Sequence, residues 1–579
     1  MRYRPDMSVN EATTPRQRTH DHALRQGSGT GWSLAAVLIA ALVMLPVGAV
    51  AWMALNPTDN IWPHLLSTVL PRYLANTAIL ALGTGLLSAA MGAGAAWLVS
   101  MYDFPGRRGL EWLLLLPLAV PAYIGAYALA DFLDYSGPVQ TALRGWFGWE
   151  SARDYWFPRI RSIEAAILVL SAALYPYVYL LTRAALHEQS GSAYEVARAL
   201  GTGPWGLFRR LGLPLARPAI VAGSAIAMME SVADYGVVSY FNVQTLNTGI
   251  FTTWLERRNA GGAAQIACVI LLVVVVLALW ERFGRRNARY HQNARQPRPI
   301  MRQRLGGLAG AAAMLACFLP FALGFLLPVG VILNYALAYP QGWVTPGLGL
   351  AAWHTVSLGA VAAVLTVLLA LIMVYGVRLS GRSLPRLLLP ITTIGYAAPG
   401  AVLAVGILIP LAALDHRVAD FWLNLTGTDP GLILTGTGFA MIFAYLVRFF
   451  AIGQGAIDGA FTRVPPSLPM AARSLGRSNL GTLRDLYLPL MRGSVGSALL
   501  LIFVDCSKEL PATLLLRPFN YETLATRVFE KASLEDLGNA APAALLVMAM
   551  GLLAVVLLAR TNLGLRKPAD RAIAGTPTG

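Results

Sequence analysis

Long runs of apolar residues alternate with short, arginine-containing polar segments along this chain of 579 residues. Each run reaches the ~20 residues that a helix needs to cross a bilayer. The pattern predicts twelve membrane-spanning helices, six in each half: 32–54, 76–102, 110–131, 163–185, 216–241 and 261–280, then 307–337, 352–377, 384–413, 431–456, 491–515 and 541–560. We therefore expect an all-α polytopic membrane protein.

Composition and charge support this expectation. Only 13% of the residues are charged, against about 25% in soluble domains. If the N-terminus is cytoplasmic, 33 of the 45 lysines and arginines fall in cytoplasmic segments, so the positive-inside rule predicts both termini in the cytoplasm. The net charge of +16 then reflects topology and contact with anionic lipid. The sequence has no basic patch with interleaved aromatic residues of the kind that would indicate a nucleic-acid partner.

One segment of the chain occurs twice, once in each half. The first copy (195–214) opens with EVARALG and ends in LGLP, and the second (470–489) opens with MAARSLG and ends in LYLP. Since six spans per half is an even number, both halves have the same orientation and form a parallel repeat. The predicted organisation is a cytoplasmic tail, a six-helix domain, a basic cytoplasmic linker, a second six-helix domain and a cytoplasmic tail: 1–31, 32–281, 282–306, 307–561 and 562–579.

These two segments, the repeated loops, have a chemistry suited to contact with another surface. Small alanines let a partner approach the backbone closely. Gly201 and Gly476 permit the turn that ends the first short helix of each copy, and Pro214 and Pro489 are expected to stop the segment before the next span. For a single copy, an amphipathic helix lying on the lipid surface is an alternative interpretation.

The repeated loops resemble the EAA loop of ABC importer permeases. The matching positions are Glu195, Ala197, Gly201, Leu211, Leu213 and Pro214 in the first copy and Ala471, Ala472, Gly476, Leu486, Leu488 and Pro489 in the second. The resemblance implies a type I ABC importer permease fold, in which each loop forms a coupling helix seated on an ATPase subunit. Two loops imply two copies of that ATPase. The sequence departs from the motif at Val196 and Met470.

The chain itself has no sequence signature of ATP hydrolysis. A phosphate-binding loop needs Gly-x-x-x-x-Gly-Lys followed by Ser or Thr, and none of the three lysines (Lys508, Lys531, Lys567) lies in that context. We therefore expect no cofactor on this chain, with ATP and magnesium bound by partner subunits. No metal-ligand spacing predicts a stable metal site, and no constellation of catalytic residues indicates a membrane-embedded enzyme.

Acidic residues within two predicted spans are candidates for a translocation path. Glu230 and Asp234 have the i, i+4 spacing that places both on one face of a helix, and Asp505 and Glu509 repeat this spacing at the equivalent positions of the second half. Intramembrane carboxylates usually face a cavity or a partner, and oxygen ligands suit hard cations. The alternative interpretation is that they pair with basic neighbours such as Lys508 and Arg517 or cap the ends of spans.

The residues around these acids resemble the ferric-iron ABC permease family. The similarity lies in KELPATLLLRPFN (508–520) and ETLAT (522–526) in the second half, and in DYGV (234–237), FNVQT (241–245) and TGIF (248–251) in the first. It implies import of Fe(III) across the bacterial inner membrane from a periplasmic ferric-iron-binding protein. The alternatives are a fused thiamine permease, which shares this layout, and an ion-gradient secondary transporter, which leaves the repeated loops unexplained.

Overall fold

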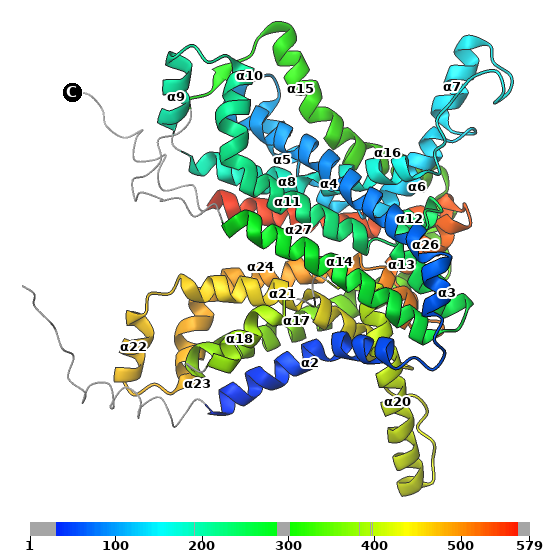
Figure 1. Ribbon diagram of the computed structural model, residues 1–579, viewed down its shortest axis with the longest axis vertical. Coiled ribbons are helices and arrows are strands. Elements are labelled where there is room, and N and C mark those ends of the chain that lie inside the picture. Colours follow the sequence, from blue (N-terminus) through cyan, green and yellow to red (C-terminus); the bar gives the residue numbers. More distant parts are fainter. Residues whose placement is uncertain are drawn as a thin grey trace, which may run out of the picture.

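The computed structural model describes residues 30–189, 191–286, 301–380, 383–393, 395 and 398–564. The described chain is almost entirely helical (Figure 1). Among these residues, eleven helices are long and apolar enough to cross a membrane, and a bent pair raises the number to twelve. The all-α polytopic fold expected from the sequence is confirmed. The predicted tails and most of the basic linker, residues 1–29, 287–300 and 565–579, lie outside the described residues.

The first half contains α2 (Thr30–Leu55), α3 (Trp62–Ser67), α4 (Leu70–Met101), α5 (Arg107–Leu113), η1 (Leu116–Ala119), α6 (Ala122–Leu133), α7 (Pro138–Phe147), α8 (Ile163–Glu188), α9 (Gly191–Ala199), α10 (Pro204–Leu207), η2 (Phe208–Gly212), α11 (Leu213–Ala233), α12 (Gly236–Tyr240), α13 (Leu246–Phe251), η3 (Thr252–Glu256) and α14 (Ala260–Arg286).

The second half contains α15 (Gly307–Phe321), η4 (Ala322–Leu326), α16 (Leu327–Ala338), η5 (Pro340–Val344), α17 (Leu348–Ser380), α18 (Ser383–Ile391), α20 (Gly400–Thr426), α21 (Phe439–Thr462), α22 (Ser467–Ser474), α23 (Asn479–Thr482), η6 (Leu483–Tyr487), α24 (Leu488–Ser507), α25 (Pro511–Leu516), α26 (Leu524–Ser533) and α27 (Leu537–Gly564). Two short strands, β1 (Tyr102–Asp103) and β2 (Gln303–Arg304), pair in parallel.

The two halves repeat each other in detail. In the first half, the Leu246 N–H at the start of α13 donates to Thr77 Oγ1 of α4 at 3.0 Å. In the second, the Leu524 N–H at the start of α26 donates to Thr355 Oγ1 of α17 at 2.8 Å. In each half a threonine of a long span thus accepts a hydrogen bond from a first-turn N–H group that the short helix itself leaves unpaired. The two threonines occupy equivalent positions in the two halves.

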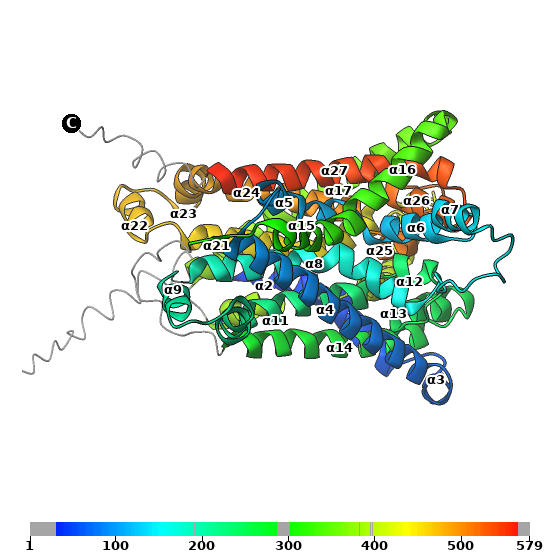
Figure 2. The ribbon, with the colours of Figure 1, turned by 90° about the horizontal axis from the view of Figure 1, so that it is seen from above.

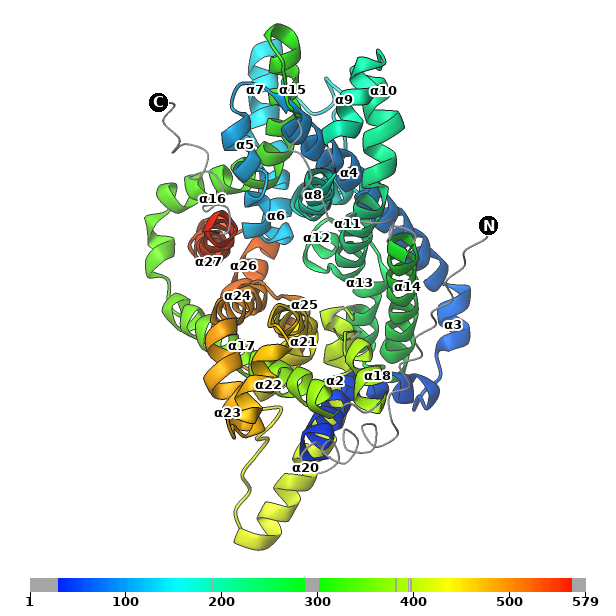
Figure 3. The same cartoon turned by 90° about the vertical axis from the view of Figure 1, so that its left-hand side faces the viewer.

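The first span of each half packs on the other half. Helix α2 packs along α17 and α20 of the second half as well as on its own α14. In return, α15 and α16 pack against α4 and α6 of the first half (Figure 3). The largest hydrophobic core accordingly joins residues of α2 and α14 to residues of α17, α20, α21 and α24. Each sequence repeat therefore completes its packing only with the other.

Four predicted spans differ from the structure because the helix breaks within the apolar run. The run at 110–131 is divided between α5, η1 and α6, bent by 99°, because Pro117 and Pro121 interrupt the helical hydrogen bonds. The run at 384–413 is likewise divided between α18 and α20. The runs at 216–241 and 491–515 end early, at Ala233 and Ser507, and each is followed by a separate short helix.

The boundaries of the remaining spans shift only modestly, the largest shift being the start of α21 at Phe439 where 431 was predicted. Seen from two directions, α9 and α22 lie at one end of the bundle, and α3 and α7 lie at the opposite end (Figures 1 and 2). The start of α2 and the end of α27 lie at the same end as α9 and α22 (Figure 1). The repeated loops are therefore at one end of the molecule, together with both ends of the described chain.

Candidate translocation cavity and repeated loops

A cavity of about 160 Å³ lies between the two halves. It is lined by the ends of α11 and α24, by the segments that follow them, and by residues of η1, α8 and α21. All four acidic residues singled out from the sequence border it. Its charged lining consists of Glu230, Asp234, Arg448, Asp505, Lys508 and Glu509.

Asp234 lies beyond the end of α11, so the prediction that it shares a helix face with Glu230 is wrong. Its backbone is extended, at φ −69° and ψ 139°. Its Oδ1 accepts the N–H of Val237 at 2.9 Å and of Val238 at 3.2 Å, which are first-turn donors of α12. A carboxylate is well suited to this position because it satisfies donors that a helix start leaves unpaired.

Glu509 plays the same structural part in the second half, after α24 has ended. Its carboxylate accepts the N–H of Ala512 and of Thr513, each at 3.2 Å, at the start of α25. It also lies 3.3 Å from Arg448 Nη1 of α21. Its side chain is almost fully buried, and a buried charge needs such partners. The alternative interpretation, that these acids pair and cap helix ends, therefore holds for Glu509.

Asp505 and Glu230 occupy equivalent positions in the last turn of α24 and α11. Lys508 Nζ lies 2.8 Å from Asp505 Oδ1, as the alternative interpretation of the sequence predicted. Lys508 lines the same cavity as Glu230 and Tyr177. Arg517, the other basic partner considered, pairs with Glu530 instead. Lys508 thus pairs with an acid of its own half and shares the cavity with an acid of the other.

Among the described residues, no group of three or more His, Cys, Asp or Glu side chains is arranged to hold a metal ion. The carboxylates of Asp234 and Glu509 accept helix N–H groups, and those of Asp505 and Glu509 contact basic side chains.

The repeated loops have the same turn geometry. Gly201 and Gly476 adopt φ values of +79° and +80°, a left-handed conformation that glycine adopts without steric cost. The Thr202 N–H reaches back to Ala197 O at 3.1 Å, and the Arg477 N–H reaches back to Ala472 O at 3.1 Å. These are the bonds of a Schellman motif, the usual helix ending at a left-handed glycine.

Pro214 and Pro489 do not stop the segment, contrary to the expectation from the sequence. Each lies at the start of a span that continues from the loop through a π-helical turn, η2 before Pro214 and η6 before Pro489. Because proline has no N–H and its ring crowds the preceding turn, the wider π turn accommodates it without ending the helix. The second part of each loop and the following span therefore form one continuous helix, Pro204–Ala233 in the first half and Asn479–Ser507 in the second.

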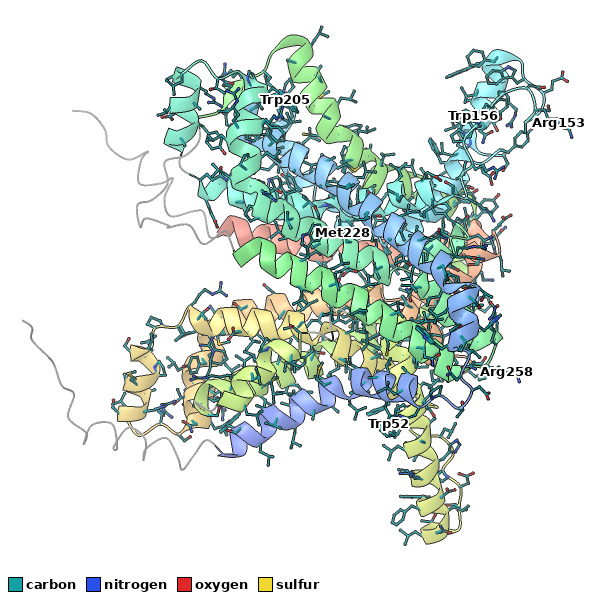
Figure 4. The ribbon with its side chains drawn as sticks, in the orientation of Figure 1. Trp52, Arg153, Trp156, Trp205, Met228 and Arg258 are labelled. Carbon is teal, nitrogen blue, oxygen red and sulfur yellow. The ribbon has the colours of Figure 1, made fainter. Side chains whose placement is uncertain are left out.

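The repeated loops expose apolar side chains at matching positions. Leu200 and Leu475 are 80% and 82% exposed, and Trp205 and Leu480 are 71% and 64% exposed. Figure 4 shows Trp205 at the end of the molecule where α9 lies. Exposed apolar groups at equivalent positions of both halves, at one end of the molecule, form two equivalent contact surfaces.

Comparison with known proteins identifies the kind of molecule. Residues 81–289 match the family of binding-protein-dependent transport system inner membrane components. The Fe(3+)-transport system permease protein FbpB 2 of Haemophilus influenzae is 25% identical over 502 residues, covering 84% of this chain and 89% of that protein. Residues 81–289 of this chain form a permease domain of that family. The chain is a multi-pass protein of the inner membrane, and it works with a separate ATPase and a separate binding protein.

Two other relatives of the permease match only part of its length. The molybdenum transport system permease protein ModB of Escherichia coli K12 is 27% identical over 200 residues, covering 34% of this chain and 83% of ModB. The sulfate transport system permease protein CysT of the same strain is 26% identical over 264 residues, covering 43% of this chain and 91% of CysT. Most of the length of ModB and of CysT thus corresponds to less than half of the permease.

Helix α9 at the first repeated loop of the permease is anchored more firmly than α22 at the second. Tyr194 of α9 is buried beside Trp97, with ring centroids 6.2 Å apart, and burial raises the pKa of Tyr194 to about 12. Arg198 Nη1 donates to Met301 O at 2.9 Å, in the described end of the linker. In the second half, α22 has no buried residue.

Sequence reasoning missed Arg448 as a residue of the cavity. It lies in the middle of α21, within an otherwise apolar run, and an arginine in such a run is a signal of a buried partner. By the register of the repeat, the positions equivalent to Arg448 and Lys508 in the first half are Ala173 and Ala233, which also line the cavity. The acids of the cavity are therefore present in both halves, whereas its bases come from the second half alone.

Proposed function

We propose that this permease imports Fe(III), driven by ATP hydrolysis on two copies of an ATPase subunit and supplied by a periplasmic ferric-iron-binding protein. The observation that carries the proposal is the convergence of Glu230, Asp234, Asp505 and Glu509 on one cavity between the halves. Four carboxylates against two basic side chains give the cavity a formal excess of negative charge, and carboxylate oxygens suit a hard trivalent cation. The Fe(3+)-transport permease among its relatives supports the same cargo.

The molecule is proposed to be two permease units fused in one chain, 32–281 and 307–561, joined by the linker 282–306. The support is twofold: relatives that are covered almost entirely match less than half of this chain, and the Thr77 and Thr355 contacts repeat in the two halves. The tails 1–31 and 562–579 are then cytoplasmic, on the side of the repeated loops. ATP and magnesium bind to the partner subunits.

The repeated loops are proposed to couple the ATPase to the path. The residues at the turn and its closure are Glu195, Ala197, Gly201, Leu211, Leu213 and Pro214, with Ala471, Ala472, Gly476, Leu486, Leu488 and Pro489. Because the part of each loop after the glycine turn continues without a break into a span that ends at the cavity, a displacement of this part would move Glu230 or Asp505 directly. Closure of the two ATPase subunits would draw the loops together and open the cavity on the opposite side.

The four acids of the cavity are proposed to have two different roles. Asp234 and Glu509 hold the breaks after α11 and α24 in shape, since both accept helix N–H groups. Asp505, which pairs with Lys508, and Glu230 at the equivalent position of the other half are proposed to meet the cargo, which would displace Lys508 from Asp505. A mobile ammonium group keeps the carboxylates satisfied when no cargo is present.

The decisive experiment is uptake by proteoliposomes that contain the permease, its ATPase and its binding protein. Radiolabelled Fe(III), thiamine and molybdate are compared, with and without ATP on the side of the repeated loops. ATP-dependent accumulation of iron alone is the expected result. Accumulation of thiamine or molybdate without iron would contradict the cargo and keep the importer, whereas accumulation of any cargo without ATP would contradict the coupling mechanism.

A further inference from the structure

Helix α20 leaves the bundle half-way along its length. Gly400 through Ile407 are buried, whereas most side chains beyond Pro410 are half-buried or exposed. The eight buried residues span about 12 Å, too short to cross a hydrocarbon core of ~30 Å. Pro410 lies at the change, where a proline weakens the helix and allows it to bend.

The outer part of α20 runs sideways. In Figure 1 it extends away from the bundle nearly across the direction of the long spans, and in Figure 3 it projects beyond the outline of the other helices. It lies at the end opposite to the repeated loops. Together with the loop that returns to α21 it forms a projection, residues 411–437, which we name the α20 arm.

The α20 arm is a preformed hairpin. Asp415 is fully buried and its carboxylate accepts the N–H groups of Ile433, Leu434 and Thr435 at 2.8 to 3.0 Å. Thr435 Oγ1 also donates to it at 2.8 Å. Charge-assisted bonds of this kind hold the returning loop against the helix.

The helix of the arm is amphipathic. Residues with the spacing of one helical face are apolar: Leu411, Leu414, Val418, Phe421, Trp422 and Leu425. The opposite face carries His416, Asp420 and Asn424 together with Leu423, and Arg417 lies at the boundary between the two faces. An apolar face normally packs inward, yet here Phe421 is 67% exposed and Leu425 is 71% exposed.

We propose that the α20 arm lies in the lipid interface on the side opposite to the repeated loops, with its apolar face in the acyl region and its polar face in the headgroups. An amphipathic helix with an aromatic apolar side is typical of that position, and tryptophan is enriched there. The surface is continuous with the lipid-facing side of the bundle, because exposed Trp52 of α2 lies beside the base of the arm (Figure 4).

The direction of the arm favours lipid over a protein partner. A binding protein that delivers cargo must sit over the cavity between the halves, whereas the arm extends beyond the outline of the other helices (Figure 3). This inference depends only on the chain being embedded in a membrane and is independent of the cargo.

The test places a nitroxide label on each face of the arm in the full chain. Phe421→Cys reports the apolar face, and Asp420→Cys is the matched control on the polar face at the preceding position. Each labelled chain is reconstituted in nanodiscs of phosphatidylcholine and phosphatidylglycerol, and the labelled unsubstituted chain provides the background from Cys268, Cys317 and Cys506. Collision of the label with oxygen, which concentrates in lipid, is compared with collision with a water-soluble nickel complex.

The expected result is an oxygen-to-nickel collision ratio several-fold higher at 421 than at 420. Equal, water-like ratios at both positions would overturn the proposal, and equal, lipid-like ratios would indicate a transmembrane arm and overturn it too. A label at 421 that is open to nickel until the binding protein is added would assign the arm to that protein instead. If Phe421→Cys does not yield folded chain, Leu425→Cys with Asn424→Cys makes the same comparison.

Discussion

At the scale of single residues, the cavity depends on a few buried charges. Glu509 is enclosed by Arg448 and the N–H groups of α25, whereas its equivalent Asp234 is held by the N–H groups of α12. A buried ion pair adds little stability over an apolar pair, but removing one partner leaves the other charge uncompensated. Loss of the Arg448 side chain should therefore destabilise the second half, because it removes the charged partner of Glu509.

We expect Arg448→Ala to destabilise the permease by about 3–5 kcal/mol, because it strands the Glu509 carboxylate. Thermal unfolding in detergent measures the effect. The double variant Arg448→Met with Glu509→Gln should recover much of the loss. Arg517→Ala is the matched control, since its partner Glu530 is partly exposed and such pairs contribute about 0–1 kcal/mol. Equal losses for Arg448→Ala and Arg517→Ala would contradict the buried-pair argument.

Glu230→Gln should lower Fe(III) uptake roughly tenfold, corresponding to about 1.4 kcal/mol of lost attraction for the cargo. The unfolding temperature is measured alongside, so that a loss of attraction for the cargo can be separated from a loss of folding. Uptake and ATPase rate are measured together in proteoliposomes. Unaltered uptake by this variant would remove Glu230 from the proposed path.

At the scale of elements, the repeated loops depend on a backbone conformation that side chains rarely adopt. Both glycines have φ near +80°, and no neighbouring atom lies close enough to oppose an added Cβ. The constraint is therefore conformational, and residues that tolerate the left-handed region should be accepted there.

Gly201→Val and Gly476→Val should each impose about 1–3 kcal/mol of local strain and sharply reduce ATP-driven uptake while membrane insertion continues. Gly201→Asn and Gly476→Asn are the matched variants, because asparagine adopts this conformation far more readily. ATPase stimulation and membrane-fraction yield distinguish coupling from folding. If the valine variants transport normally, the turn is not part of the coupling mechanism.

At the scale of the whole molecule, the two halves are interlocked. Helix α2 packs on α17 and α20, and α15 with α16 packs on α4 and α6. Since a shared core buries apolar surface of both halves, the association does not depend on the linker.

Separate expression of 1–290 and 291–579 in one cell should therefore yield a complex that co-purifies through a tag on either half. Each half alone should be recovered in much lower amount, because its partner-facing helices lack their packing surface. A third pair, with residues 1–55 deleted from the first half, should associate more weakly. Recovery of stable separate halves would show that the crossed helices are not needed for folding.

The membrane class, most of the spans, the repeat and the four acids of the cavity could all be predicted from the amino-acid sequence. The length of the apolar runs, the positions of the arginines and the constant offset between the two copies of the repeat are properties of the residue order. They can be recognised without knowing which segments contact one another. The left-handed turn of the repeated loops could also be predicted, because Gly201 and Gly476 each follow a short predicted helix, where glycine is the usual residue at a left-handed ending.

Only the tertiary structure decided where the helices break and what surrounds each charge. The ends of α11 at Ala233 and α24 at Ser507 lie within apolar runs, and they are stable because Asp234 and Glu509 accept the donors of the next helix. The continuation of the spans through Pro214 and Pro489 needed the π turns. The partnership of Arg448 with Glu509 joins residues of different spans, and such contacts between distant segments leave no periodic trace in the sequence.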